Sequence, residues 1–263
     1  MLGAIAGDII GSRFEWRNLK STEFELFTNA CRPTDDSNMT LAVAWAIMNA
    51  ESDWSKLSQE AVKCMQLVGR NYPDGFGARF EDWVGSADPQ PYNSWGNGSA
   101  MRVSPCGWAA KTLEEALRLS DAVTAVTHNH PEGMKGARAV TAAIFLARSG
   151  RNKDEIRSHI CENYYPLDFT LDAIRPAYRF DVSCQGSVPQ AIEAFLEAES
   201  YEDAVRKAVS IGGDSDTIAA IAGSIAEAYF GMPEEIRSAA LGKLDDTRRE
   251  IYECFRKLYL TEK

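Results

Sequence analysis

Two short acidic tracts hold the residues of this sequence that are best suited to chemistry. The first is Thr34–Ser37 and the second is Gly212–Thr217, and each lies directly before a strongly apolar, helix-forming run. Each tract places two carboxylates and a threonine hydroxyl at a predicted helix start. Helix capping is the simpler interpretation of either tract alone, because Asp, Ser and Thr accept hydrogen bonds from the free N–H groups of a first turn.

Together the tracts carry more carboxylates than capping requires: Asp35, Asp36, Asp214 and Asp216. Bringing these groups together inside a protein is costly in repulsion and lost hydration unless cations neutralise them. Oxygen ligands without a nearby His or Cys select hard cations such as Mg2+, Mn2+ or Ca2+ over zinc. If the tracts meet in the fold, we expect two divalent cations between them.

Further polar residues lie in loops and suit an anionic ligand. Gly96–Ser99 is a glycine-rich turn whose backbone N–H groups could bind a phosphate, although a plain turn with an N-cap explains it equally well. Arg102 could add a charged donor, or it could pair with a carboxylate. His128 and His130 share a loop but lack a third soft ligand, so we favour a structural role for this loop over a metal pair.

Helical spacing of apolar residues dominates the chain and predicts an all-α fold. Apolar residues recur at i, i+3, i+4 and i+7 in segments 41–48 and 140–147, and sustained strand-like alternation is missing. The predicted helices are 54–70, 113–126, 190–198, 201–209, 217–230 and 234–259, with turn-rich interruptions near 71–77, 85–98, 128–133 and 181–189. These interruptions are too short and too aromatic for flexible linkers, so we expect a single domain over residues 1–263.

A glycine repeat near the start predicts a closely packed first helix. Gly3, Gly7 and Gly11 fall on one helical face, and each costs about 1 kcal/mol of helix propensity relative to alanine. Close backbone packing must therefore compensate. The polar residues Asp8 and Glu15, which lie in the same segment, are not explained by packing.

Composition excludes several classes of partner. The chain has 38 acidic and 28 basic residues and a net charge of −10, without a Lys/Arg cluster, so we expect no general nucleic-acid binding. Apolar runs such as 218–222 are far shorter than the roughly 18 to 20 residues of a membrane span, and the first residues do not resemble a secretory signal. The six scattered cysteines predict buried, reduced thiols. We therefore expect a cytoplasmic protein.

Five motifs in order make the chain resemble the ADP-ribosylglycohydrolase family, of the dinitrogenase-reductase-activating glycohydrolase type. They are residues 7–15 (GDIIGSRFE), 34–37 (TDDS), 95–102 (WGNGSAMR), 127–133 (THNHPEG) and 210–217 (SIGGDSDT). The stretch 184–191 (CQGSVPQA) is also similar to bacterial members. The resemblance implies a compact, orthogonal all-α bundle around a dimetal centre. It further implies magnesium-dependent hydrolysis of the C1 glycosidic bond between ADP-ribose and a modified acceptor.

The resemblance also implies roles for individual residues. The implied metal ligands are Thr34, Asp35, Asp36, Asp214, Asp216 and Thr217, with Asp216 as the bridge between two Mg2+ ions that Mn2+ could replace. Glu15, Asp35 and Asp36 are the candidates for the base that takes a proton from water. The implied substrate-binding residues are Asn97, Gly98, Ser99, Met101, Arg102 and His128. The aromatic residues Phe76, Tyr92 and Trp95 could stack on adenine, although core packing is the commoner use.

Two other functions stay open at this point. The first is a non-catalytic ADP-ribose-binding relative, although the intact acidic tracts favour an enzyme. The second is a metal-dependent phosphoesterase, which usually needs more histidines than the three present. The acceptor also stays open: arginine, serine, another side chain, a nucleic-acid base or a free metabolite. The sequence does not determine the oligomeric state, and we favour a monomer.

Overall fold

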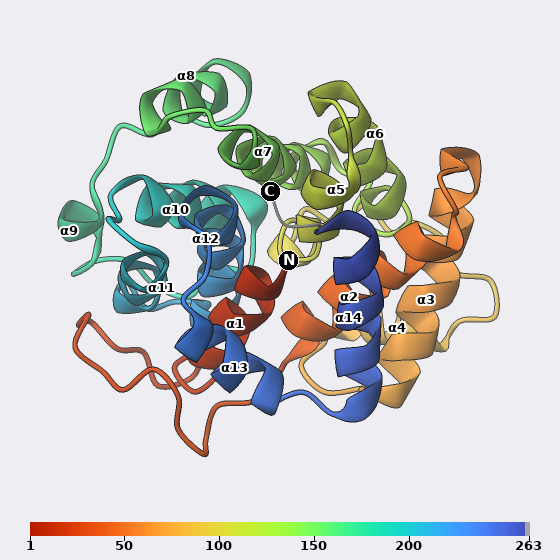
Figure 1. Cartoon of the computed structure of the whole chain (residues 1–263), viewed down its shortest axis with the longest axis horizontal. Helices are drawn as coiled ribbons and strands as arrows, with labels where there is room; N and C mark the ends of the chain where they lie inside the picture. Colours follow the sequence, from red (N-terminus) through yellow and green to blue (C-terminus); the bar gives the residue numbers. More distant parts are fainter. Residues whose placement is uncertain (261–263) are drawn as a thin grey trace.

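The computed structural model of the chain describes residues 1–260, and these residues are all-α, as predicted (Figure 1). Their only β-type pairing is an isolated bridge between Gly96 and Ser183. The helices are α1 (Leu2–Gly11), α2 (Asp35–Asn49), α3 (Leu57–Asn71), α4 (Ala78–Gly85), α5 (Ser104–Ala109), α6 (Leu113–Thr124), α7 (Pro131–Arg148), α8 (Lys153–Asn163), α9 (Leu171–Ile174), α10 (Cys184–Leu196), α11 (Tyr201–Ser210), α12 (Ser215–Phe230), α13 (Glu234–Gly242) and α14 (Asp246–Tyr259). Two short 3₁₀ turns are η1 (Trp54–Lys56) and η2 (Asn97–Ser99).

Helix α1 lies in the interior of the bundle and packs along α12 (Figure 1). Every residue of α1 is buried. A Cβ atom built on Gly7 would overlap the carbonyl group of Ala219, and one built on Gly11 would lie 2.6 Å from Cα of Asp216. The glycine repeat therefore lets the two backbones touch. This confirms the predicted close packing and brings the end of α1 next to the start of α12.

Helices α2 and α12 both begin at the acidic tracts. Thr34 caps α2, since its Oγ1 accepts a hydrogen bond from the Asp36 N–H at 3.3 Å. Asp214 occupies the same position before α12 but makes no capping bond with its side chain. Gly212 and Gly213 lead into it with φ angles of +70° and +75°, which glycine adopts without strain. Capping thus explains Thr34 and leaves the carboxylates for another task.

Two predicted boundaries are wrong, because side-chain caps start helices that apolar spacing does not reveal. Segment 234–259 forms two helices, since Oδ1 of Asp245 accepts from the Arg248 N–H at 2.9 Å and starts α14. Segment 181–189 is helical from Cys184 onward, since Oγ of Ser183 accepts from the Gly186 N–H at 3.1 Å.

Short helices are a second source of error. The helices α4, α5 and α9 have eight, six and four residues and lie outside the predicted ranges, because so few residues show no clear period. Four longer helices are confirmed with small differences at their ends: 54–70, 113–126, 201–209 and 217–230.

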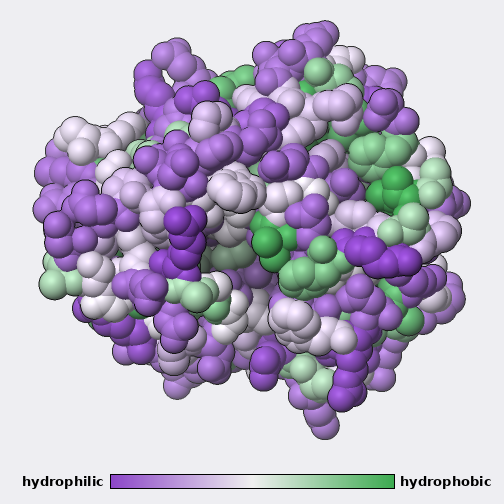
Figure 2. All heavy atoms as spheres, turned by 180° about the vertical axis from the view of Figure 1, so that it is seen from behind, coloured by the Kyte–Doolittle hydropathy of each residue, from purple (hydrophilic) through white to green (hydrophobic). Residues whose placement is uncertain are grey.

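The surface and interior of the described residues separate by polarity. Buried apolar side chains form one connected cluster, and the face shown in Figure 2 is mainly hydrophilic. Four of the six cysteines are buried, but Cys161 and Cys254 are exposed, so the prediction of buried thiols is wrong for these two.

Within residues 1–260, no helix is both long enough and apolar enough to cross a membrane.

Candidate dimetal site and substrate cavity

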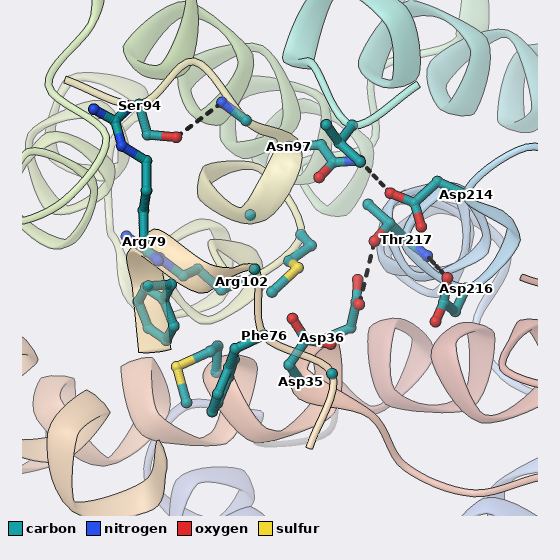
Figure 3. Close-up of a pocket in the computed structure, with 18 of the residues that line it drawn as sticks. Asp35, Asp36, Phe76, Arg79, Ser94, Asn97, Arg102, Asp214, Asp216 and Thr217 are labelled. Carbon is teal, nitrogen blue, oxygen red and sulfur yellow. Dashed lines mark hydrogen bonds between the residues drawn. The ribbon is translucent and has the colours of Figure 1, made fainter. Parts of the chain in front are cut away.

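The two acidic tracts meet where α2 and α12 begin (Figure 3). Oγ1 of Thr217 donates a hydrogen bond to Oδ2 of Asp36 at 3.2 Å, across 181 positions of sequence. Carboxylate oxygens gather there in two groups, and within each group they lie within 4.8 Å of one another. The groups are Asp8 with Asp36 and Asp216, and Glu15 with Asp214 and Asp216. The predicted contact between the tracts is confirmed, and Asp216 is the residue that the two groups share.

Asp8 is the member of this cluster for which the sequence predicts no role. Its Oδ2 accepts from the N–H groups of Thr34 and Ser37 at 2.9 and 3.1 Å. Its Oδ1 accepts from the Thr34 hydroxyl at 2.7 Å, and the Ser37 hydroxyl donates to Oδ2. These bonds fasten α1 to the first turn of α2. The available signal was a carboxylate inside an otherwise apolar, glycine-rich helix, but its partners depend on the fold.

The cluster is mostly buried, and its carboxylates form no ion pairs with cationic side chains of residues 1–260. Asp36 and Asp216 are only 2% and 3% exposed. Burial, and then the charges of neighbouring carboxylates, raise the pKa of both groups well above the usual range. Glu15 is less deeply buried, and burial followed by the charge of Asp214 raises its pKa to about 7. None of the ion pairs in residues 1–260 involves a carboxylate of the cluster.

The donor set fits hard divalent cations. Oδ1 of Asp36 is buried and has no hydrogen-bond partner among the described residues. A buried oxygen in this state costs free energy unless a ligand satisfies it. The surrounding ligand atoms are carboxylate and hydroxyl oxygens, which are the ligands that Mg2+ and Mn2+ prefer.

Asp35 and Thr34 differ from the other predicted ligands in their surroundings. Asp35 faces the adjacent cavity but belongs to neither oxygen group. Burial, and then the charge of Asp8, raise its pKa to about 8. Gly75 lies against it with a φ of +97°, and a Cβ atom there would overlap Oδ1 of Asp35. The Thr34 hydroxyl donates to Asp8 and lies 3.4 Å from Oδ2 of Asp36.

A cavity of about 540 Å³ adjoins the cluster. This volume lies within the range of roughly 300 to 1,000 Å³ that small-molecule sites occupy. Phe76 and Arg79 lie across the cavity from Asp214 and Asp216 (Figure 3). The cavity therefore joins an acidic end to an end lined by an arginine and aromatic rings.

Comparison with known proteins identifies the family. A sequence model of the ADP-ribosylglycohydrolase family matches residues 1–263. The chain belongs to this family. It is accordingly an enzyme of the ADP-ribosylglycohydrolase type, and the resemblance drawn from the five motifs is confirmed.

This ADP-ribosylglycohydrolase is similar to several named proteins. It is 27% identical over 227 residues to the ADP-ribosylarginine hydrolase Tri1 of Pseudomonas putida, a match that covers 77% of this chain and spans only 60% of the length of Tri1. It is 25% identical to the human ADP-ribosylhydrolase ARH3, with 98% of this chain and 93% of ARH3 covered. A solved structure, described as an ADP-ribosylglycohydrolase-related protein complex, superposes on this chain with a TM-score of 0.71 at 22% sequence identity. The superposition covers 98% of this chain and 96% of the chain in that structure, so the two share a fold.

The glycine-rich turn of this ADP-ribosylglycohydrolase uses most of its donors internally. Of the four backbone N–H groups expected to bind a phosphate, that of Gly96 donates to Ser94, that of Asn97 to Val182 and that of Ser99 to Gly96. At most the N–H of Gly98 is left for a ligand.

The residues in and just after this turn divide between the cavity and the interior. Asn97, Gly98 and Met101 line the cavity. The amide of Asn97 donates to Oδ2 of Asp214 at 2.7 Å, so this residue supports the acidic cluster from the cavity wall. Ser99 is fully buried, and its hydroxyl donates to the Gly133 carbonyl at 2.9 Å.

Arg102 and His128 form a buried, hydrogen-bonded chain beside the cavity. Nη2 of Arg102 donates to Oγ1 of Thr127 at 2.6 Å, and this oxygen lies 2.7 Å from Nδ1 of His128. The hydroxyl accepts from Arg102 and can direct its own hydrogen to Nδ1, and in that arrangement the proton of a neutral His128 is on Nε2. Burial, and then the charge of Arg102, lower the pKa of His128 well below its usual range. His130 instead caps α7, accepting from the Glu132 N–H at 3.1 Å.

Proposed function

We propose that this enzyme hydrolyses the C1 glycosidic bond between ADP-ribose and a modified acceptor, and that it uses two Mg2+ ions, which Mn2+ can replace. The observation that supports this most directly is the buried pair of oxygen groups that share Asp216 at one end of the cavity. A buried cluster whose carboxylates form no ion pairs favours cations, and the adjoining cavity of about 540 Å³ has the size of a small-molecule site.

The proposed metal ligands are Thr34, Asp35, Asp36, Asp214, Asp216 and Thr217. Asp214, Asp36 and Asp216 have the strongest geometric support, because each belongs to an oxygen group. Asp8 shares a group with Asp36, but it already accepts four hydrogen bonds, so its main part is to hold Thr34 and Ser37 in place. When bound, the cations neutralise the carboxylates and polarise the water and ribose hydroxyls that they contact.

Glu15 is the base that we favour among the three candidates. It lines the cavity, belongs to an oxygen group with Asp214 and Asp216, and is less buried than Asp36. In the proposed step, a water oxygen bonds to C1 while one of its protons passes to Glu15. The bond between C1 and the acceptor breaks, and the acceptor leaves with the electron pair and takes up the proton that Glu15 received from the water.

The other residues lining the cavity would hold the rest of ADP-ribose. Arg102 offers a positive charge, and Nε2 of His128 and the backbone N–H of Gly98 offer donors suited to a diphosphate or ribose. Tyr92 lies 5.9 Å from the His128 ring, measured between centroids, and also lines the cavity. It is the aromatic residue that we favour for contact with adenine.

A panel of conjugates tests the proposal. Purified protein is incubated with arginine-, serine- and nucleotide-linked ADP-ribose, with Mg2+ or with EDTA, and the products are identified by mass spectrometry. The arginine conjugate comes first, because the relative Tri1 is named as an ADP-ribosylarginine hydrolase. Release of intact ADP-ribose that stops with EDTA and returns with Mg2+ supports the proposal. AMP would indicate a phosphoesterase, and binding without turnover would indicate a non-catalytic ADP-ribose-binding protein.

A further inference from the structure

Asn18 makes an unusual set of hydrogen bonds in the loop that carries Glu15. Its Nδ2 atom lies within hydrogen-bond distance of three carbonyl oxygens: those of Phe14 at 3.0 Å, Glu15 at 2.8 Å and Gly213 at 3.0 Å. Its Oδ1 atom accepts from the Gly213 N–H at 2.7 Å. One side chain thus closes the turn around Glu15 and also pairs with both backbone groups of Gly213.

This pairing joins two segments that each supply a ligand oxygen. Glu15 lies three residues before Asn18, and Asp214 directly follows Gly213. The carboxylates of Glu15, Asp214 and Asp216 form one of the two oxygen groups. Gly213 sits in a turn of positive φ, and Asn18 holds both of its backbone groups, whereas Asn97 holds the carboxylate of Asp214 from the cavity wall.

We propose that Asn18 is a positioning residue that holds Glu15 against Asp214 and so sets the geometry of this one oxygen group. The inference rests on the proposed function, in which the group binds a cation. Asn18 makes no hydrogen bond to Asp8 or Asp36, the members of the other group besides the shared Asp216. The effect of removing it should therefore fall on one of the two ions.

Asn18→Ala is a clean variant, because Asn18 is exposed and its truncation leaves no cavity in the core. We expect one Mn2+ ion to bind at least about tenfold more weakly, because the variant loses about the net free energy of one hydrogen bond that holds the ligands in place. The second ion should bind within about twofold of the wild type. Isothermal titration with Mn2+ alone measures both. Asn163→Ala is the matched control, since Asn163 is also exposed and donates one amide bond, to the His159 carbonyl, far from the site.

Hydrogen exchange of the metal-free protein gives a second readout. The Gly213 amide should exchange at least about tenfold faster in Asn18→Ala than in the wild type, because it loses its acceptor. Asn18→Asp keeps an acceptor oxygen and should protect this amide. If the alanine variant does not fold, Asn18→Ser is titrated in its place.

The outcomes separate this inference from the proposed function. Wild-type protein that binds no Mn2+ would overturn the proposed function and the inference with it. Wild-type protein that binds two ions, together with an Asn18→Ala variant that binds both with unchanged affinity, would overturn the inference alone. Equal weakening of both ions would also overturn it, because Asn18 would then act on the whole site rather than on one oxygen group.

Discussion

Two places in the cavity wall bury groups of opposite charge, and in neither place does the group form an ion pair within the described residues. At the acidic end, several carboxylates lie together without an ion pair to a side chain of residues 1–260, and their pKa values are raised. Elsewhere in the wall, Arg102 is 1% exposed and bonds only to the neutral oxygens of Val123 and Thr127. Burial lowers the pKa of its guanidinium to about 10. No carboxylate within residues 1–260 forms an ion pair with it, so of the two alternatives left open for Arg102, pairing with a carboxylate is not found.

This difference shows how the fold prepares for a ligand of mixed charge. A buried charge without a partner costs free energy in the empty protein, and that cost is recovered when a partner binds. Both places line the same cavity. If the proposal is right, changes at the acidic end should mainly alter turnover, and changes at Arg102 should mainly alter binding.

Asp216→Asn should have the largest effect, because Asp216 belongs to both oxygen groups. We expect kcat to fall by about a thousandfold in saturating Mg2+, the scale seen when a preorganised electrostatic contact is lost. The metal-free melting temperature should stay the same or rise, since one repelling charge is gone. Steady-state kinetics and thermal melts measure the two effects.

Two variants sharpen this result. Asp35→Asn should also lose activity, but less than Asp216→Asn, because Asp35 belongs to neither oxygen group. Asp203→Asn removes a surface carboxylate that pairs with Lys207 and should leave kcat unchanged. Full turnover by Asp216→Asn would contradict the assignment of the metal site.

Arg102→Met should have the next largest effect, and this effect should be on substrate binding rather than on kcat. Methionine fills most of the buried volume but offers no charge, so we expect KM and the Kd of ADP-ribose to rise by about ten- to a hundredfold. The loss in kcat should be smaller. Arg118→Met is the control, since Arg118 is an exposed residue paired with Glu114. A change in kcat alone would place Arg102 with the catalytic groups and would contradict the expected difference between the acidic end and Arg102.

The sequence predicted the parts of this molecule that local pattern governs. Helical spacing predicts the all-α fold, and the glycine repeat predicts the close packing of α1, because both depend on neighbours along the chain. The split at Asp245 and the early start of α10 were missed, since a single capping side chain decides each one. The spacing of acidic residues before apolar runs indicated the two tracts that lie together in the fold, and the family resemblance supplied their proposed roles as metal ligands.

What could not be predicted depends on contacts between distant segments. Asp8 receives its donors from α2, and Asn18 receives its partner from the turn before α12. The glycine-rich turn resembles a phosphate site in sequence, yet three of its four N–H groups donate within the protein. Residue types alone do not reveal which donors the fold has already used.

Binding of Mg2+ should stabilise the protein by a moderate amount. A cation at about a hundred times its Kd contributes about 2.7 kcal/mol when it binds only the folded state. For a chain of this size we expect the melting temperature to rise by about 5 °C or more, and Mn2+ should act similarly. The Asp216→Asn variant should show little of this rise. An unchanged melting curve across millimolar metal would count against a metal site at the acidic end.

The smallest effect should be a pH dependence of stability in the metal-free protein. Glu15 and Asp35 have folded-state pKa values of about 7 and about 8, above the ordinary values of 4.5 and 3.8. Between these limits the folded state holds more protons than the unfolded state, so stability falls as pH rises. In EDTA, the melting temperature should drop by roughly 5 °C from pH 6.5 to 8.5. The lowered pKa of His128 acts in the opposite direction, but mainly below its ordinary value of 6.5. Bound Mg2+ would keep the carboxylates ionised, so saturating Mg2+ should remove this dependence of the melting temperature on pH. An equal dependence with and without Mg2+ would mean that these carboxylates do not hold the ions.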